Sequence, residues 1–347
     1  MPETGESVEL SALGPVLVTG GGGFLGLGLV RRLAAGGLQL RSFSRSLYPE
    51  LDQLGVLQVR GDLADAEAVR TAVRGCRMVF HVAAKAGIWG DPGEFERANV
   101  DGSRNVVAAC LAEGCRRLVY TSSPSVVFHG GDLDGVNESV PLASSFTADY
   151  PRTKAQAERE TLQAAADQGL AVIALRPHLI WGPGDSHILP GLAARAKAGQ
   201  LRRLGSRSCR VDFTYIDNAV EAHVRAALAL VQKPELSGQV YFISDDAPVE
   251  LWDFINRMLV AAGAPPVERS IPAAVARFAG GILETVYRLL PLSGEPRITR
   301  FLAEQLSTSH WFDISAAKKD LGYRPVVSVD EGIRRLAQWL SMSAGGV

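Results

Sequence analysis

The sequence is poor in cysteine and in net charge. Its four cysteines (Cys76, Cys110, Cys115 and Cys209) form no C-x-x-C pair and show no metal-like spacing with the six histidines. We therefore expect reduced thiols in a cytoplasmic protein, and no metal site. The formal net charge is −1 and no basic face is evident, so a nucleic-acid partner is not expected.

Long uncharged hydrophobic runs are also lacking. Residues 271–292 are apolar enough to raise the question of a membrane span, but Arg277, Glu284 and Arg288 interrupt them. A span needs about 20 predominantly apolar residues. An amphipathic helix fits the stretch better, either covering an apolar pocket or making at most a peripheral membrane contact. The lack of a dense Lys/Arg cluster favours the pocket cover.

Glycine, in contrast, is plentiful, and three glycines define the first candidate site. Residues 16–19 read as a short buried strand and an apolar-periodic helix follows, with Gly20, Gly23 and Gly26 between them at G-x-x-G-x-x-G spacing. Gly20 permits the turn, Gly23 lets the backbone approach a pyrophosphate, and Gly26 lets the helix pack close to the strand. The helix N-terminus offers N–H groups to the phosphates. This pattern predicts a dinucleotide site rather than a merely flexible loop.

Strands and helices alternate through the first half of the chain. Further strands are expected at 38–43, 56–59, 77–81, 116–121 and 170–176, with helices at 94–113 and 150–168. This alternation predicts an α/β fold with a doubly wound parallel sheet, whose ligands lie at the carboxyl ends of the strands.

The chain divides into two regions after a polar, acidic start. Residues 1–14 are expected to be a disordered leader and not a signal peptide. Residues 15–180 would form the dinucleotide-binding domain, joined by a returning strand near 239–244. Residues 181–238 and 245–347 would form a smaller mixed substrate-binding region, with helices near 189–199, 217–231, 251–263 and 271–290.

Tyr150 and Lys154 are the candidate catalytic pair. Their i, i+4 spacing places both on one face of a helix, where the ammonium would lower the pKa of the phenol and could also hold ribose hydroxyls. Ser123, just past a strand, could hold a substrate carbonyl against the tyrosine, although the neighbouring Ser122 offers the same group. The alternative is an exposed helix-start tyrosine beside a solvated lysine.

The residue after the second strand indicates which cofactor is bound. NAD sites often carry an acidic residue there, whereas this chain has Ser44 followed by Arg45. A small hydroxyl and a guanidinium suit a 2′-phosphate, which favours NADP(H) over NAD(H). Asp62, after the third strand, could accept a hydrogen bond from the adenine amino group or cap the helix starting near Ala64.

Seven motifs together resemble the extended short-chain dehydrogenases/reductases, and most closely their 3β-hydroxysteroid dehydrogenase branch. They are TGGGGFLG (19–26), GDL (61–63), NVDGS (99–103), TSSPSV (121–126), YPRTK (150–154), RPHLIWGPGD (176–185) and YIDN (215–218). Within this branch, SFSRSLYPEL (42–51), AAKAGIWG (83–90) and residues 299–323 are similar to the 2-alkyl-3-oxoalkanoate reductases of bacterial long-chain olefin synthesis.

The resemblance implies roles for individual residues. Tyr150 would be the general acid, Lys154 its electrostatic partner, Ser123 the carbonyl hydrogen-bonder, and Asn99 a support for the site. The expected cofactor contacts are Gly20, Gly23, Phe24, Leu25, Gly26, Ser44, Arg45, Asp62, Leu63, Ala83, Ala84, Tyr150, Lys154 and Pro177. Candidates to line an apolar substrate cleft are Trp89, His178, Trp181, His187 and the helix over 271–290.

The expected reaction is NADPH-dependent reduction of a long-chain 2-alkyl-3-oxoalkanoic acid in olefin biosynthesis. The alternatives are an NAD(P)-dependent 3β-hydroxysteroid or sterol dehydrogenase and, more distantly, a non-catalytic dinucleotide sensor. The resemblance also implies a homodimer, and association with other enzymes of the olefin pathway is conceivable. The dimer would form through the helices after the fourth and fifth strands, whose outer faces are expected to carry Val106, Val107, Cys110, Leu111, Ala157, Thr161 and Leu162.

Overall fold

A seven-stranded parallel sheet forms the centre of the molecule. The computed structural model describes residues 10–185, 188–290, 292 and 294–344. The strands pair in the order β12 (Val240–Ile243), β7 (Ala171–Pro177), β5 (Arg117–Thr121), β4 (Met78–His81), β1 (Val16–Thr19), β2 (Leu40–Ser44) and β3 (Leu57–Arg60). The predicted doubly wound parallel sheet is confirmed.

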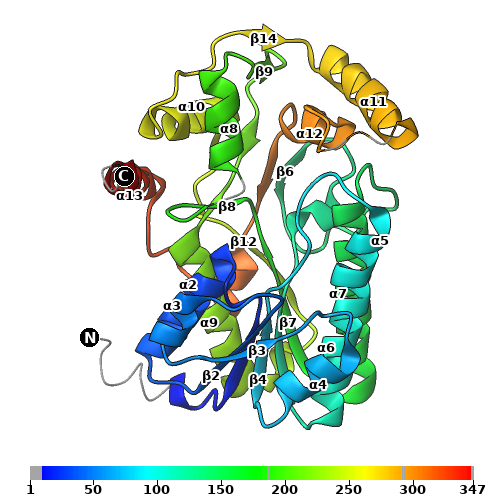
Figure 1. The fold of residues 1–347 in the computed structure, drawn as a ribbon, viewed down its shortest axis with the longest axis vertical. Coiled ribbons are helices and arrows are strands. Elements are labelled where there is room, and N and C mark those ends of the chain that lie inside the picture. Colours follow the sequence, from blue (N-terminus) through cyan, green and yellow to red (C-terminus); the bar gives the residue numbers. More distant parts are fainter. Residues whose placement is uncertain (1–9, 186–187, 291, 293, 345–347) are drawn as a thin grey trace.

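Helices cover both faces of this sheet (Figure 1). One face packs on α2 (Phe24–Ala35) and α9 (Ile216–Gln232), and the other on α4 (Ala66–Val73), α6 (Gly102–Ala112) and α7 (Asp149–Gln168). Side chains alternate along β1, so that Val16 and Val18 enter the first hydrophobic core while Leu17 enters the second. Near-continuous apolar runs such as VLVT follow from burial on both faces.

The N-terminal boundary differs from the prediction. Leu10 and Leu13 are fully buried in the first core cluster. The leader predicted over 1–14 is therefore too long, because its last residues contribute two apolar side chains that the core encloses.

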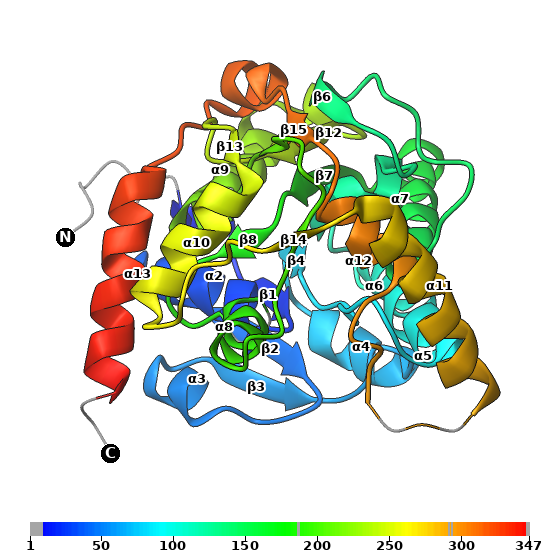
Figure 2. The ribbon, with the colours of Figure 1, turned by 90° about the horizontal axis from the view of Figure 1, so that it is seen from above.

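A smaller region lies beyond one end of the strands of this sheet, above the sheet in Figure 1 and in front of it in Figure 2. It contains a mixed sheet in the order β13 (Val249–Glu250), β10 (Arg210–Val211), β15 (His310–Phe312) and β6 (Leu133–Val136). Two further strand pairs are β8 (Ile180–Trp181) with β11 (Thr214–Tyr215) and β9 (Arg203–Leu204) with β14 (Ser270–Ile271). Its helices are α8 (Leu189–Lys197), α10 (Leu251–Ala261), α11 (Ala273–Leu289), α12 (Arg300–Gln305) and α13 (Val329–Ala344).

One predicted helix takes a different form. The helix expected over 94–113 is divided into α5 (Pro92–Phe95), a π-helical turn η1 (Glu96–Asp101) and α6. The strand β6 was not predicted. No helix within the described parts of the chain is both long enough and apolar enough to cross a membrane.

Candidate active site

The glycine turn after β1 lies against the end of β4. Gly20 has a φ of +71°, and a Cβ there would lie 3.0 Å from the Cα of Ala83. A Cβ on Gly26 would lie only 2.1 Å from the carbonyl oxygen of Gly20, so the start of α2 can approach β1 only with glycine here. The Thr19 hydroxyl accepts the backbone N–H groups of Val82 and Ala83, each at 3.1 Å. The strand ends are thus held side by side around the turn, and α2, with Phe24 and Leu25 in its first turn, begins directly above it.

Buried hydroxyls without a partner lie on β2 and directly after β5. Within the described residues, the Oγ atoms of Ser42, Ser44 and Ser122 are buried and make no hydrogen bond. Such groups are costly unless something satisfies them, and the hydroxyls of a bound dinucleotide could do so. The glycine turn and these orphaned serines therefore fit a dinucleotide cofactor.

Two arginines meet where β2 and β3 end. Arg45 is exposed directly after Ser44, and its backbone carbonyl accepts a hydrogen bond from Nε of Arg60 at 3.1 Å. Arg60 is paired in register with Ser44 across the two strands. Arg60 is not among the cofactor contacts predicted from the sequence, although its place at the end of the neighbouring parallel strand could have suggested it as one.

Asp62 is not the helix cap. Its carboxylate accepts the N–H of Ala64 at 2.9 Å in a local turn, whereas Asp65 caps α4, which begins at Ala66. Leu63 is buried beneath Gly102, where a Cβ would come within 2.8 Å of the leucine. The capping alternative for Asp62 is wrong, and the residue is exposed after the end of β3.

Lys154 is buried on α7 and turned toward β5. Its Nζ donates to the Tyr120 hydroxyl at 2.9 Å and to the carbonyl oxygen of Thr121 at 2.6 Å, and it lies 4.3 Å from the centre of the Tyr120 ring. Burial lowers the pKa of Lys154 to about 7, and the Glu158 carboxylate opposes this shift. Glu158 is itself held in a buried two-point ion pair by Arg176, at 2.9 and 2.5 Å.

Tyr150 is half-buried at the start of the same helix. Burial raises the pKa of its phenol, and the Ser123 hydroxyl opposes that shift. The expected lowering of this pKa by Lys154 is not seen: burial dominates the shift, and the ammonium donates to Tyr120 and Thr121. Ser123 rather than Ser122 interacts with the phenol, and its Oγ also lies 2.9 Å from Oγ of Ser125.

Asn99 connects the π-helical turn to the loop after β4. Its side chain accepts the N–H of Lys85 at 2.7 Å and donates to the carbonyl of Lys85 at 3.1 Å. The same amide donates to Oγ1 of Thr153 at 3.0 Å, one residue before Lys154. The asparagine thereby fixes the loop that carries Ala84 and Trp89 relative to the start of α7.

The proposed substrate contacts are not brought together. Trp89 is half-buried and packs edge-on against Tyr287 of α11, with ring centres 6.1 Å apart. Trp181 is fully buried against Tyr215 and Phe254, so it is a core residue and not a substrate contact. His187 lies outside the described residues.

His178, which follows the buried Pro177 at the end of β7, belongs to a buried polar chain. Its Nδ1 is 2.6 Å from Asp212 and its Nε2 is 3.2 Å from Nδ1 of His310, whose Nε2 is 2.8 Å from the carbonyl of Gln305. A carbonyl only accepts, so His310 donates to it through Nε2 and, when neutral, accepts from His178 through Nδ1. His178 therefore donates one proton to His310 through Nε2. A second proton lies between its Nδ1 and the Asp212 carboxylate. Sequence reasoning placed His178 but missed His310.

A phenol and a hydroxyl therefore meet past the end of β5, with a buried ammonium one helical turn along α7, on a sheet whose first turn fits a dinucleotide. This arrangement on a doubly wound parallel sheet defines an NAD(P)-dependent oxidoreductase of the short-chain dehydrogenase/reductase class. A profile of the 3-beta hydroxysteroid dehydrogenase/isomerase family matches residues 17–272, and the chain belongs to that family.

Two named reductases and one solved structure are similar to most of the chain. The chain is 49% identical over 326 residues to the 2-alkyl-3-oxoalkanoate reductase of Shewanella oneidensis, covering 92% of this chain and 84% of the relative. It is 50% identical over 323 residues to the enzyme of the same name from Stenotrophomonas maltophilia, covering 92% and 98%. The solved structure of MoeE5 in complex with UDP-glucose and NAD matches 95% of this chain and 100% of its own, with a TM-score of 0.73 and 26% identity.

Proposed function

We propose that the protein reduces a 2-alkyl-3-oxoalkanoic acid to the corresponding 3-hydroxy acid with NADPH, as a step of long-chain olefin biosynthesis. The observation that carries this proposal is the near-50% identity, over 92% of the chain, to two reductases of that name. The interaction of Ser123 with Tyr150, and the burial of Lys154 on the same helix, supply the groups that such a reduction needs.

The protonation state of Tyr150 suits reduction. A bound nicotinamide cofactor supplies the hydride that a carbonyl carbon accepts. Because burial raises the pKa of Tyr150, the phenol is protonated at neutral pH and can give its proton to the oxygen of that carbonyl. Ser123 would hold the same oxygen, and the Lys154 ammonium would stabilise the negative charge as it develops.

The cofactor preference rests on the charges at the ends of β2 and β3. Arg45 and Arg60 would face the 2′-phosphate of NADPH, with Ser44 as a neutral neighbour in place of a repelling carboxylate. Asp62 and Leu63 would contact the adenine side, while Ala83, Ala84 and Pro177 would line the path of the nicotinamide half. The glycine turn would hold the pyrophosphate.

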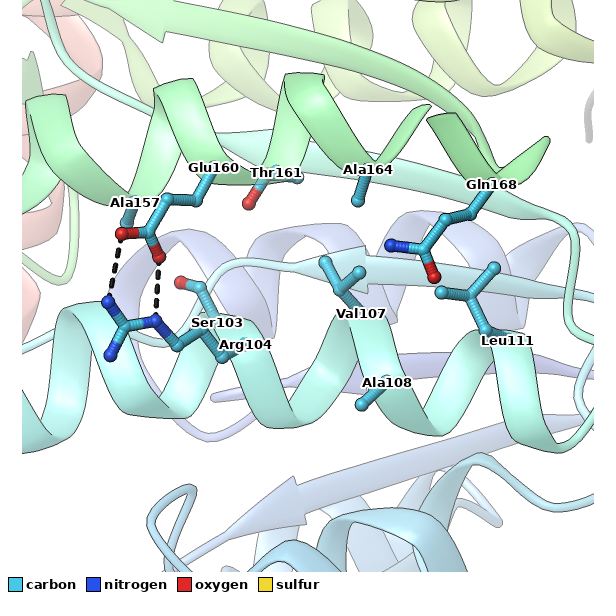
Figure 3. A pocket seen from close by; sticks show the side chains of 10 residues that line it. All are labelled: Ser103, Arg104, Val107, Ala108, Leu111, Ala157, Glu160, Thr161, Ala164 and Gln168. Atoms are coloured by element: carbon cyan, nitrogen blue, oxygen red, sulfur yellow. Dashed lines mark hydrogen bonds and ion pairs between the residues drawn. The ribbon is translucent and has the colours of Figure 1, made fainter. Parts of the chain in front are cut away.

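A homodimer through α6 and α7 is the proposed assembly. A shallow hollow of about 240 Å³ lies between the two helices, with the ion pair of Arg104 and Glu160 at one end (Figure 3). Val107, Leu111, Ala157 and Thr161 line it. Val106, Cys110 and Leu162 do not, and they pack in or against the second core cluster. Association with other olefin-pathway enzymes and a cytoplasmic location stay predictions.

The second candidate is a 3β-hydroxysteroid or sterol dehydrogenase, favoured by the family to which the chain belongs. Steady-state turnover of the purified protein separates the two. We expect NADPH oxidation with a 2-alkyl-3-oxo acid and little reduction of NAD⁺ or NADP⁺ with a 3β-hydroxysterol. Brisk sterol oxidation without turnover of the keto acid would overturn the proposal.

A dinucleotide sensor without catalysis is the third candidate, and the conservative change Tyr150→Phe tests it. Removing the proton donor should reduce turnover about 10²–10⁴-fold while NADPH affinity stays within twofold of wild type. A sensor would keep its biological effect in this variant.

A further inference from the structure

One face of α11 is fixed to α12. Ala276, Gly280 and Glu284, spaced four residues apart, are the buried positions of the helix. A Cβ on Gly280 would lie 2.7 Å from the backbone carbonyl carbon of Thr299, so the two segments are in close contact. The Glu284 carboxylate accepts the backbone N–H of Arg300 at 2.6 Å and its Nε at 2.8 Å. This face of α11 is covered by α12 and its polar group is paired, so the helix is held in one orientation.

The opposite face carries large apolar side chains in contact with solvent. Val275, Phe278, Ile282 and Leu289 fall on one stripe of the helix, and Phe278 and Leu289 are 73% and 78% exposed. Leu290 and Leu292 extend the stripe past the end of α11. Six of the twelve large hydrophobic side chains exposed in the described residues thus belong to this one segment. Such a concentrated patch marks a surface of interaction.

Positive charge surrounds the stripe. Residues 269–300 contain five arginines and two glutamates in a chain whose net charge is −1. One of the glutamates, Glu284, is buried and paired with Arg300, whereas Glu295 and the neighbouring Glu268 are exposed, and Glu304 of α12 lies near Arg277 and Arg300. A hollow of about 440 Å³ opens on this side, and the residues that line it include Arg277, Phe278, Ile282 and Arg300. Figures 1 and 2 both place α11 along the outer edge of the molecule.

We propose that the exposed face of α11, with the segment to Leu292, docks on the surface of an anionic lipid bilayer. The apolar stripe would enter the boundary between headgroups and acyl chains, while the flanking arginines would meet lipid phosphates and carboxylates. Charge complementarity selects this occupant, because a second copy of the chain would bring the same positive charge to the same stripe.

The docked helix would lie next to the active-site loop. Tyr287 and Arg288 contact Trp89, the arginine 5.7 Å from the indole, in the loop that follows β4 and is clamped by Asn99. If the proposed function holds, a long-chain acid dissolved in the bilayer would reach the site beside this contact. Docking itself does not depend on the reaction, so it can be tested without a substrate.

Flotation of the full-length protein with vesicles tests the proposal. Phosphatidylcholine vesicles with and without phosphatidylglycerol are compared for wild type, for the double variant Phe278→Asp/Ile282→Asp, and for Val260→Asp. Val260, on α10, is 61% exposed and serves as the matched control. Circular dichroism melting confirms that each variant folds.

We expect wild type and Val260→Asp to bind anionic vesicles, the double variant to lose at least tenfold in affinity, and binding to weaken with salt. Equal binding of the folded double variant would overturn the proposal. So would equal binding to neutral vesicles. A wild-type oligomer that the double variant dissociates, without any vesicle binding, would assign the face to a second copy instead.

Discussion

At the scale of residues, the distinctive contact is the one between Lys154 and Tyr120. The ammonium is buried, donates to the phenol oxygen and lies over its ring, and its pKa is lowered to about 7. Below that pH the lysine carries the charge that stabilises a developing alkoxide, and above it the charge is lost. We therefore predict that kcat/KM for reduction falls as the pH rises through about 7.

The variant Tyr120→Phe assigns this pH dependence. Removing an acceptor of the ammonium destabilises its charged form, so the descending limb should move down by about one pH unit. The ring and its packing remain, which makes the measurement specific to the hydroxyl. An unchanged pH profile in an active variant would show that Tyr120 only packs.

Arg45 tests the proposed cofactor preference, also at the scale of single residues. A guanidinium paired with a 2′-phosphate should make Arg45→Ala weaken NADPH binding about 10- to 100-fold and NADH binding less than twofold. Fluorescence titration of both cofactors checks this. Equal losses for the two would mean that Arg45 does not touch the phosphate, and Arg60→Ala would then be the variant to compare.

Sequence reasoning at this scale found the residues whose spacing is local. Tyr150 and Lys154 lie one helical turn apart, and Ser123 follows a strand that could be recognised. Tyr120 and His310 were missed, because their partners are distant in the chain: His310 meets His178 across 132 residues. The contacts of Lys154 with Tyr120 and Thr121, and the burial that shifts the pKa values of Lys154 and Tyr150, depend on tertiary packing and not on spacing.

At the scale of elements, the start of α2 has no room for a side chain at Gly26. Gly26→Ala would place a Cβ 2.1 Å from the Gly20 carbonyl, so the helix must shift away from β1. We predict a loss of about 1–3 kcal/mol of stability and of dinucleotide binding. Gly191→Ala, on α8 with nothing within 4 Å of the new Cβ, is the control and should be neutral or stabilising. Melting temperature and NADPH titration measure both, and equal behaviour of the two variants would contradict the assigned role.

Most strands and long helices were predictable from periodicity, whereas three kinds of element were not. The π-helical turn η1 has no signal in the apolar pattern and is held by the bonds of Asn99. The strands β6 and β15 are short, and they pair with each other, with β10 on the other side of β15. Helix α13 was not predicted, although it follows a turn that Asn218 fixes by accepting the N–H groups of Val326 and Val327.

At the scale of the whole molecule, the groove between α6 and α7 predicts a dimer. Ala108 is exposed in that groove, so Ala108→Arg should leave the fold intact while placing two arginines in the proposed interface. Light scattering should show a dimer for wild type and a monomer for the variant. The same mass for both would place the interface elsewhere or remove it.

The two regions of the molecule meet where the chemistry is proposed, and the reaction can be followed by isotope. NADPH carrying deuterium at both C4 positions of the nicotinamide is incubated with a 2-alkyl-3-oxo acid, and the product is analysed by mass spectrometry. Wild type should form a hydroxy acid with one deuterium at C3, whereas Tyr150→Phe should form almost no labelled product. An unlabelled product, or equal labelling by the variant, would contradict the proposed reaction.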